Sequence, residues 1–228
     1  MLNVGGYLPL SLSDYPGKVA SVVFLQGCNW RCGFCHNGDL LKAGVCRGFS
    51  EGFVFDKIRI GAKALQGIVI SGGEPTCQDG LEGFITSIKS EFSGLLVKLD
   101  TNGTNPKVIK NLVDEKLVDF ISMDIKTSKN KYEKLTRARE FVYRDIEESV
   151  DILKGSGVEY ELRTTVVPGF FDKEDREEIK GVVNGVKKYI LQSFDSHHVL
   201  DKRFSLLKGV NESFLTEYKS NFANCQVR

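Results

Sequence analysis

Short apolar runs alternate with longer amphipathic stretches along this chain, and each run ends in residues that favour turns. The runs are continuously hydrophobic, which is typical of strands that are buried on both faces of a parallel sheet. Six strands are predicted, at residues 19–25, 67–71, 95–100, 118–124, 159–167 and 188–194. Helices are predicted at about residues 53–65, 81–92, 106–116, 143–153, 173–186 and 211–222. The alternation of strands and helices therefore indicates an α/β protein.

The number of strand–helix units separates the possible architectures. Eight units would close a (β/α)8 barrel, whereas six leave the barrel open or produce a doubly wound sheet. In both cases the chemistry lies at the C-terminal ends of the strands. We therefore expect the functional residues directly after the predicted strands.

The composition is that of an ordinary globular protein. The chain has 228 residues, of which 41% are hydrophobic and 27% are charged, which is enough for one domain with a sizeable core. The net charge of +1 provides no global field for nucleic acid or for an anionic membrane. No apolar stretch approaches the length of a membrane span. Neither nucleic acid nor a membrane is therefore expected as a partner.

The cysteines suggest a reducing compartment. The chain has six cysteines and no N-terminal pattern of a secretion signal, so we expect a cytoplasmic protein whose thiols bind metal more readily than they form disulfides. Cys46, Cys77 and Cys225 are scattered singly, and we expect packing or chance, rather than function, to account for them. The other three lie together.

Cys28, Cys32 and Cys35 lie in one loop directly after the first predicted strand, with the spacing C-x3-C-x2-C. Three thiolates on one turn can hold three corners of an iron–sulfur cube. No fourth cysteine follows at ligand spacing, so one iron would keep an open position. A substrate or a cofactor can bind at an open metal position, so the loop is a candidate for chemistry.

Other interpretations fit parts of the same loop. Cys32 to His36 matches the c-type haem pattern C-x-x-C-H, but haem attachment requires export. Cys32 and Cys35 form a redox-type C-x-x-C, which leaves Cys28 unexplained. Three cysteines and His36 could also hold a structural zinc ion, although such sites usually draw their ligands from two separated pairs. The loop alone leaves the zinc ion and the cluster both open.

Polar residues follow the other predicted strands as well. The candidates at these strand ends are Gly72, Gly73, Glu74, Asp100, Asp124, Lys126 and Arg163. Paired glycines let a backbone approach a ligand closely, or they simply form a turn with positive φ. The two aspartates could bind a ribose hydroxyl or a hard cation, or could cap the following loops. The lysine and the arginine could neutralise a carboxylate.

Taken together, these motifs resemble the radical S-adenosylmethionine (SAM) superfamily. The resemblance covers about residues 10–194 and includes Gln26-Gly27-Cys28, Gly72-Gly73-Glu74-Pro75-Thr76, Asp124-Ile125-Lys126 and Arg163-Thr164-Thr165. Within the superfamily, the chain is similar to activating enzymes of glycyl-radical enzymes, and most of all to anaerobic ribonucleoside-triphosphate reductase activating proteins. The resemblance implies a single domain over residues 1–228. This domain would have an open partial (β/α)6 barrel as its core, at about residues 18–194, and a C-terminal helical extension at about 195–228.

The resemblance also implies what the cysteine loop binds. Cys28, Cys32 and Cys35 would ligate a [4Fe-4S] cluster whose fourth iron takes the amino and carboxylate groups of SAM. Phe34 occupies the aromatic position beside the third cysteine, where it would contact adenine. A reduced cluster would cleave SAM to a 5′-deoxyadenosyl radical, with flavodoxin or ferredoxin as the electron donor.

The same resemblance assigns roles at the strand ends. The methionine ammonium of SAM would be held by Gly72, Gly73 and Glu74. Asp124 and Lys126 match an Asp-x-Lys motif that is expected near SAM and its carboxylate.

A cation and a protein partner are implied as well. Asp100, Thr101 and Asp124 could share a monovalent cation, as in some activating enzymes. The radical would remove a hydrogen atom from a glycine of a partner glycyl-radical enzyme, anaerobic ribonucleoside-triphosphate reductase in particular.

Two rival functions belong to other classes. One is a small-molecule radical SAM enzyme such as a 7-carboxy-7-deazaguanine synthase, which would need extra polar groups in its barrel for a pterin-like substrate. The other is a non-catalytic zinc-binding module.

Overall fold

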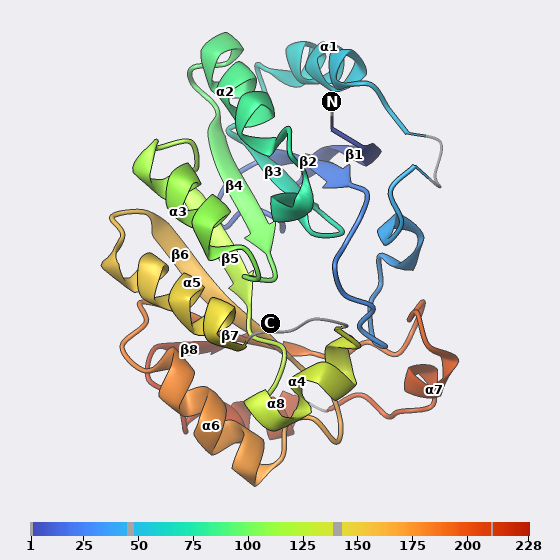
Figure 1. The fold of residues 1–228 in the computed structure, drawn as a ribbon, viewed down its shortest axis with the longest axis vertical. Helices are drawn as coiled ribbons and strands as arrows, with labels where there is room; N and C mark the ends of the chain where they lie inside the picture. Colours follow the sequence, from blue (N-terminus) through green and yellow to red (C-terminus); the bar gives the residue numbers. More distant parts are fainter. Residues whose placement is uncertain (1, 45–47, 139–142, 211) are drawn as a thin grey trace.

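The computed structural model describes residues 2–44, 48–138, 143–210 and 212–228. Within these ranges one eight-stranded sheet runs through the molecule in the order β1 to β8 (Figure 1). Neighbouring strands from β2 to β8 pair in parallel, and β1 pairs antiparallel with β2. The strands are β1 (Val4–Ser11), β2 (Ala20–Leu25), β3 (Gly67–Gly72), β4 (Leu96–Thr101), β5 (Phe120–Asp124), β6 (Glu159–Val166), β7 (Tyr189–Ser193) and β8 (Cys225–Val227).

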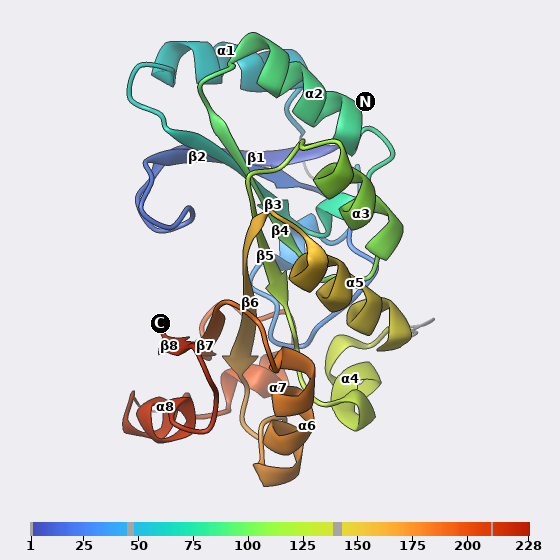
Figure 2. The same ribbon diagram turned by 90° about the vertical axis from the view of Figure 1, so that its left-hand side faces the viewer.

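Helices connect the parallel strands and cover one face of the curved sheet, as Figure 2 shows for α2, α3 and α5. The helices are α1 (Glu51–Gly61), α2 (Leu81–Glu91), α3 (Pro106–Asp114), α4 (Lys129–Thr136), α5 (Tyr143–Gly155), α6 (Lys173–Val183), α7 (Lys202–Ser205) and α8 (Glu212–Lys219). Two short 3-10 helices, η1 (Gly38–Leu40) and η2 (Pro75–Cys77), lie in the loops after β2 and β3. Local sequence sets several helix starts: Ser50 caps α1, and Asp172 forms a capping box with Asp175 at α6.

The predicted open partial barrel is confirmed. The six predicted strands are β2 to β7, which lie side by side in chain order in the described sheet. Six described elements were not predicted, namely β1, α4, β8 and the short helices η1, η2 and α7. The first strand contains Gly5, Gly6 and Pro9, which are poor strand formers, and its positions 8 to 10 are all exposed. Helix α4 offers only Tyr132 and Leu135 as apolar residues, too few for a recognisable period.

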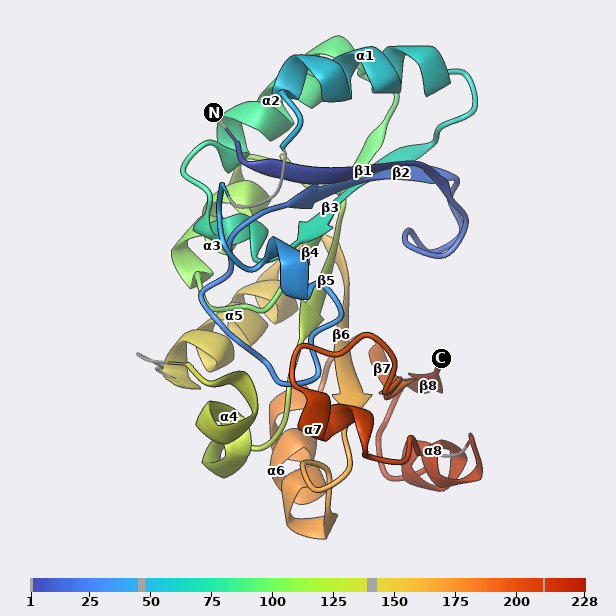
Figure 3. The ribbon, with the colours of Figure 1, turned by 90° about the vertical axis from the view of Figure 1, so that its right-hand side faces the viewer.

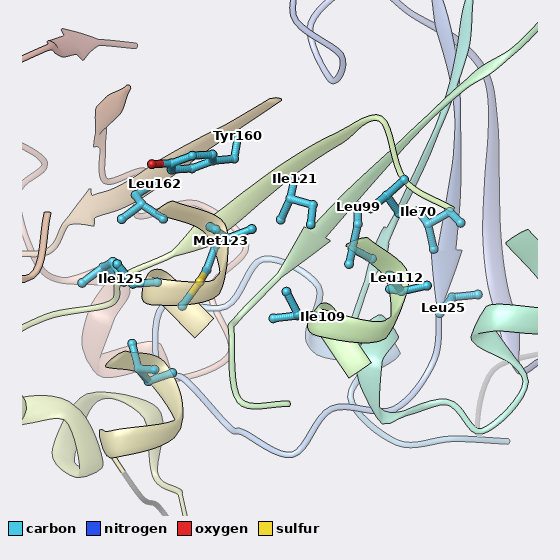
Figure 4. Close-up of a cluster of buried hydrophobic side chains, with 14 of the residues drawn as sticks. Leu25, Ile70, Leu99, Ile109, Leu112, Ile121, Met123, Ile125, Tyr160 and Leu162 are labelled. Atoms are coloured by element: carbon cyan, nitrogen blue, oxygen red, sulfur yellow. The ribbon is translucent and has the colours of Figure 1, made fainter. Parts of the chain in front are cut away.

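The main core lies between the sheet and the helices. Figure 4 shows side chains of the neighbouring strands β2 to β6 in one buried cluster with Ile109 and Leu112 of α3. Leu99 and Ile121 of the sheet, and Ile109 and Leu112 of the helix, have no exposed surface. Burying each such side chain contributes about 1.5–3 kcal/mol before entropy is counted. This packing explains why the strands are hydrophobic along their whole length.

The opposite, inner face of the sheet is covered differently. The loop between β1 and β2 folds over it (Figure 2) and buries Tyr15 against Ala20, Val22 and Val69. The ring of Tyr15 lies 5.7 Å from that of Phe120, measured between centroids. Tyr15 therefore closes the inner face near the N-terminal ends of the strands. The inner face stays accessible near their C-terminal ends.

The C-terminal extension is more than helical. Besides α7 and α8 it contributes β8, which adds to the sheet beside β7. Helix α7 lies beside the loop that follows β2 (Figure 3), and Leu200 donates a backbone hydrogen bond of 3.0 Å to the carbonyl oxygen of Cys35. The predicted extension is thus a structural part of the cysteine region. In the described part of the chain, every helix is too short or too polar to cross a membrane.

Tyr15 provides a test of the inner-face packing. Replacing Tyr15 by Ala should lower the free energy of unfolding by about 3 kcal/mol, because the mutation empties a buried aromatic site. Leu12→Ala, in the same loop, should change it by less than about 0.5 kcal/mol, since Leu12 is 73% exposed. Urea denaturation of both variants measures the difference, and equal effects would contradict the proposed packing.

Candidate functional site

One cavity of about 230 Å³ lies at the C-terminal ends of the strands. Every residue that the sequence singled out for a site lines this cavity. These residues are Cys28, Cys32, Phe34, Cys35, Gly72, Gly73, Glu74, Asp100, Asp124, Lys126 and Arg163. They come from the loop after β2 and from the ends of β3, β4, β5 and β6. Parallel pairing brings them together, because it places all of these strand ends at one edge.

The cysteine loop is held by backbone hydrogen bonds to α4. The amides of Arg31 and Gly33 donate to the carbonyl oxygens of Thr136 and Leu135, at 2.8 and 3.3 Å. The last carbonyls of a helix have no partner within the helix, so the loop satisfies groups that would otherwise need water. Helix α4 therefore positions the loop, although nothing in the sequence pattern predicted this helix.

The C-terminal segment closes on the same loop from another side. The amide of Asp201 donates 3.0 Å to the carbonyl oxygen of Gly33. A Cβ at Gly33 would lie 2.2 Å from the ring of Phe204, so only glycine fits beneath α7. The central glycine of the loop thus serves a close contact with the C-terminal segment.

Among the three thiols of the loop, that of Cys32 is buried and those of Cys28 and Cys35 are half-buried. Burial raises the pKa of Cys28 to about 12 and that of Cys32 to about 11, and it also raises the pKa of Cys35. The charge of Lys126 opposes these shifts at all three thiols. Metal binding requires thiolates, so loading this loop must release protons.

The arrangement of the ligands bears on the choice between zinc and a cluster. Across the described ranges, no three His, Cys, Asp or Glu side chains are gathered in a way that could hold a single metal ion. The Nε2 atom of His36 lies 3.0 Å from the carbonyl oxygen of Asp195, so the histidine is engaged elsewhere. Three cysteines that line one cavity fit a cluster better, because each would bind a different iron.

Lys126 is held in place from several directions. Its Nζ atom donates 2.8 Å to Oδ2 of Asp124 and lies 5.6 Å from the centroid of the Phe34 ring. Its backbone amide donates 3.0 Å to the hydroxyl of Tyr132, a buried side chain of α4. A fixed ammonium therefore stands next to both the cysteine loop and an aromatic face.

Asp124 is the centre of a group of half-buried charges. Its Oδ1 atom accepts 2.8 Å from Nε of Arg163, and its Oδ2 atom accepts from Lys126. Burial alone would raise the pKa of this carboxyl, but the two cations hold it well below its usual range. Arg163 also reaches Asp100, at 3.4 Å from Nη1 to Oδ1.

These contacts oppose the cation that the resemblance implied for Asp100, Thr101 and Asp124. Both oxygens of Asp124 accept from cationic side chains. The hydroxyl oxygen of Thr101 accepts 3.1 Å from the amide of Gly103, and the hydroxyl donates to Glu74. The oxygens expected to hold a metal cation are therefore occupied by protein groups.

The two glycines after β3 are required by the backbone of the protein itself. Gly72 has φ of +115°, and a Cβ there would lie 2.4 Å from the backbone of Leu25. A Cβ at Gly73 would lie 2.1 Å from the carbonyl oxygen of Gly27. The amide of Glu74 donates 2.8 Å to that same oxygen. The glycines thus let the end of β3 lie directly on the start of the cysteine loop.

Glu74 has a different environment from the one that the sequence suggested. Its buried carboxylate accepts from the amide and hydroxyl of Thr76, from the Thr101 hydroxyl at 2.7 Å and from the Asn102 amide at 2.6 Å. Burial raises the pKa of Glu74, and these hydrogen bonds oppose the shift. The carboxylate joins the end of β3 to the end of β4. This saturation argues against the expected contact with a methionine ammonium.

Sequence reasoning missed several residues of the site. Asn37 donates 3.0 Å from Nδ2 to the carbonyl oxygen of Gly72, and Asn102 donates 2.9 Å to Asn29. Lys98 of β4 lies under the cavity and pairs with Asp100. A lysine within an apolar strand was the available signal for Lys98, whereas the asparagines are common loop residues without a distinguishing pattern.

Of the remaining cysteines, Cys77 lies next to this loop, since it lines a second cavity together with Cys28 and Asn29. Cys225 is buried on β8, as expected of a packing residue, and Cys77 is exposed at the end of η2. The expectation for Cys46 falls outside the described residues.

Comparison with protein families gives a match to the radical SAM superfamily over residues 22–183. A protein of Methanocaldococcus jannaschii is 37% identical over 217 residues, which are 94% of this chain and 89% of the relative. That relative carries an assignment, itself an inference, as a glycyl-radical enzyme activating enzyme. The pyruvate formate-lyase-activating enzyme of Listeria monocytogenes is 36% identical over 135 residues, covering 54% of this chain and 53% of that enzyme.

Solved structures confirm the fold. Streptococcus suis SuiB bound to its precursor peptide SuiA superposes with a TM-score of 0.65 at 13% sequence identity. The superposition covers 91% of this chain but 48% of SuiB. The likeness therefore covers more of the chain than the matched family region.

A matched pair of glycine substitutions tests the contact at the end of β3. Gly73→Ala should lower the free energy of unfolding by about 2–3 kcal/mol, because the new methyl group meets backbone that cannot move aside. Gly83→Ala, in α2, has open space around it and should instead raise stability by about 0.5–1 kcal/mol. Thermal denaturation distinguishes the two signs, and a neutral Gly73→Ala would refute the contact.

Proposed function

The chain belongs to the radical SAM superfamily, and from this premise we propose that it activates a partner enzyme by removing a hydrogen atom from one of its glycines. The relative that is 37% identical over 94% of this chain supports the assignment most strongly. Enzymes of this superfamily use a [4Fe-4S] cluster and SAM, which together supply a carbon-centred radical by one-electron cleavage of SAM. The protein positions these groups and shields them from water.

In this proposal Cys28, Cys32 and Cys35 each ligate one iron. The loop can present three thiolates at fixed positions because α4 and the 200–201 segment hold its backbone. The ammonium of Lys126 lowers the cost of gathering negative charge there, as its effect on all three thiols indicates. Rigid support of this kind keeps the ligands in position when the cluster changes charge.

The SAM side of the cavity is formed by the strand ends. We assign Phe34 to the adenine ring of SAM. We assign Lys126 and Arg163, which both pair with Asp124, to the carboxylate of SAM. The backbone at Gly72 and Gly73 borders the cavity and supports the methionine end. Glu74 acts indirectly, because its carboxylate fixes the backbone of that segment.

The proposal extends to the partner enzyme, the electron donor and the compartment. We propose anaerobic ribonucleoside-triphosphate reductase as the partner and flavodoxin or ferredoxin as the electron donor, since iron–sulfur potentials can be as low as about −700 mV. The cytoplasm is the compartment that suits a loop of free thiols.

A second candidate is supported by one observation. The inner face also carries Lys98, which pairs with Asp100, and Glu161, which pairs with Lys188, and a small-molecule enzyme such as a 7-carboxy-7-deazaguanine synthase would use such polar groups. However, Glu161 is fully buried and accepts from Lys188 at 3.0 Å and from Arg228 at 3.3 Å. Because these groups pair with one another, the activating function is preferred.

Cysteine substitutions test the cluster assignment. Cys32→Ala should abolish SAM cleavage and lower the bound iron, because one corner of the cube loses its ligand. Cys225→Ala should leave both unchanged, since Cys225 lies on β8 and does not line the cavity. Iron and sulfide analysis after anaerobic purification, with an assay for 5′-deoxyadenosine, gives both readouts. Uptake of zinc without a cluster would rule out the proposal.

Incubation with candidate partners tests the substrate. The reconstituted protein with SAM, a reductant and anaerobic ribonucleoside-triphosphate reductase should produce the EPR doublet of a glycyl radical. Pyruvate formate-lyase serves as the comparison partner, and a signal with it alone would reassign the partner. Turnover of a pterin substrate without any glycyl radical would favour the small-molecule enzyme.

A further inference from the structure

Lys98 is a buried lysine whose side-chain orientation is set by its position on β4. It lies on β4 between Val97 and Leu99, which both point into the helix-covered core, so its own side chain points to the inner face. Only 1% of Lys98 is exposed, and its Nζ atom donates to Oδ1 of Asp100. A buried ammonium is costly unless a carboxylate pairs with it. The strand therefore places a positive charge directly under the cavity.

Lys98 completes an alternating row of charges along the strand ends. The row runs from Lys98 to Asp100, then to Arg163, Asp124 and Lys126. Each carboxylate lies between two cations, and the row has three positive and two negative groups. A metal cation added here would meet an excess of positive charge. It would also have to displace a cationic side chain from the carboxylate oxygens that the metal would need as ligands.

We propose that the Lys98 ammonium serves as a built-in cation for the pair Asp100 and Asp124, so that the SAM site of this protein works without bound potassium or sodium. Lys98 is then a positioning residue: it holds Asp100 in place, Asp100 holds Arg163, and Arg163 holds Asp124. This proposal can be tested by SAM affinity, which rests on the proposed function, and by the melting temperature, which does not.

The other charged groups near Lys98 are already paired. Glu161 of β6 also faces it, but that carboxylate is held by Lys188, Arg228 and the hydroxyl of Ser122. Burial lowers the pKa of Lys98, and the charge of Asp100 opposes this shift. Lys188 offers a matched control, because removing its ammonium leaves Glu161 with Arg228.

The experiment compares salts at constant ionic strength. SAM affinity and the melting temperature of the reconstituted protein are measured in potassium, sodium, ammonium and choline chloride. For the wild type, both should be the same in all four salts. Lys98→Met should bind SAM about tenfold more weakly in choline, and potassium or ammonium should restore both affinity and melting temperature. Lys188→Met should show no specific response to the cation.

Two results would overturn the proposal. One is a wild type that loses SAM affinity when choline replaces potassium, which would mean that a metal cation binds despite Lys98. The other is a Lys98→Met variant whose affinity and melting temperature in choline equal those of the wild type. If the wild type binds no SAM at all, the proposed function fails, and the rescue of the melting temperature of Lys98→Met still tests the role of Lys98.

A second variant covers the case in which Lys98→Met does not fold. The double variant Lys98→Met/Asp100→Asn removes both charges of the pair and leaves no unpaired carboxylate. It should fold and should be insensitive to the choice of cation. A double variant that requires potassium for stability would contradict the proposal, because no carboxylate would remain at position 100 to need a cation.

Discussion

The structure of the site depends on one close backbone contact, between the end of β3 and the first residues of the cysteine loop. Gly73 lies on the carbonyl oxygen of Gly27, and the amide of Glu74 donates a hydrogen bond to that oxygen. This contact fixes where the chain leaves β2 and therefore where the three cysteines can go. The carboxylate of Glu74 then joins the same point to the end of β4. Three strand ends are thus held together without any ligand.

A row of ion pairs further fixes the side chains at the strand ends. Five charged side chains alternate along the inner edge of β4, β5 and β6, with Asp124 at the point where two cations meet. Buried charges are tolerated only when they are paired and hydrogen-bonded, so each group restricts the next. The resulting row is well suited to recognise a zwitterionic ligand such as SAM. It also explains why residues such as Lys98, which do not reach the ligand, affect the geometry of residues that do.

Much of the architecture could be predicted because its signals are local. Continuous apolar runs identified β2 to β7, and turn residues identified the strand ends at which the site is formed. The elements that were missed have weak local signals: β1 contains glycines and exposed leucines, α4 is mostly polar, and β8 has three residues. These elements form because of what they pack against. Tyr132, for example, makes α4 part of the core by packing on Trp30 of the cysteine loop, with ring centroids 5.5 Å apart.

The sequence by itself determined which residues line the cavity, since the C-terminal ends of parallel strands must meet at one edge and the spacing of Cys28, Cys32 and Cys35 places three thiols on one loop. It could not determine how these residues are used. Only the tertiary structure showed that Glu74 is saturated by protein donors, that Gly33 makes room for Phe204, and that Lys98 occupies the charge position under Asp100. Those facts depend on contacts between residues far apart in the chain, and a local pattern carries no information about which distant group will complete a buried hydrogen bond or ion pair.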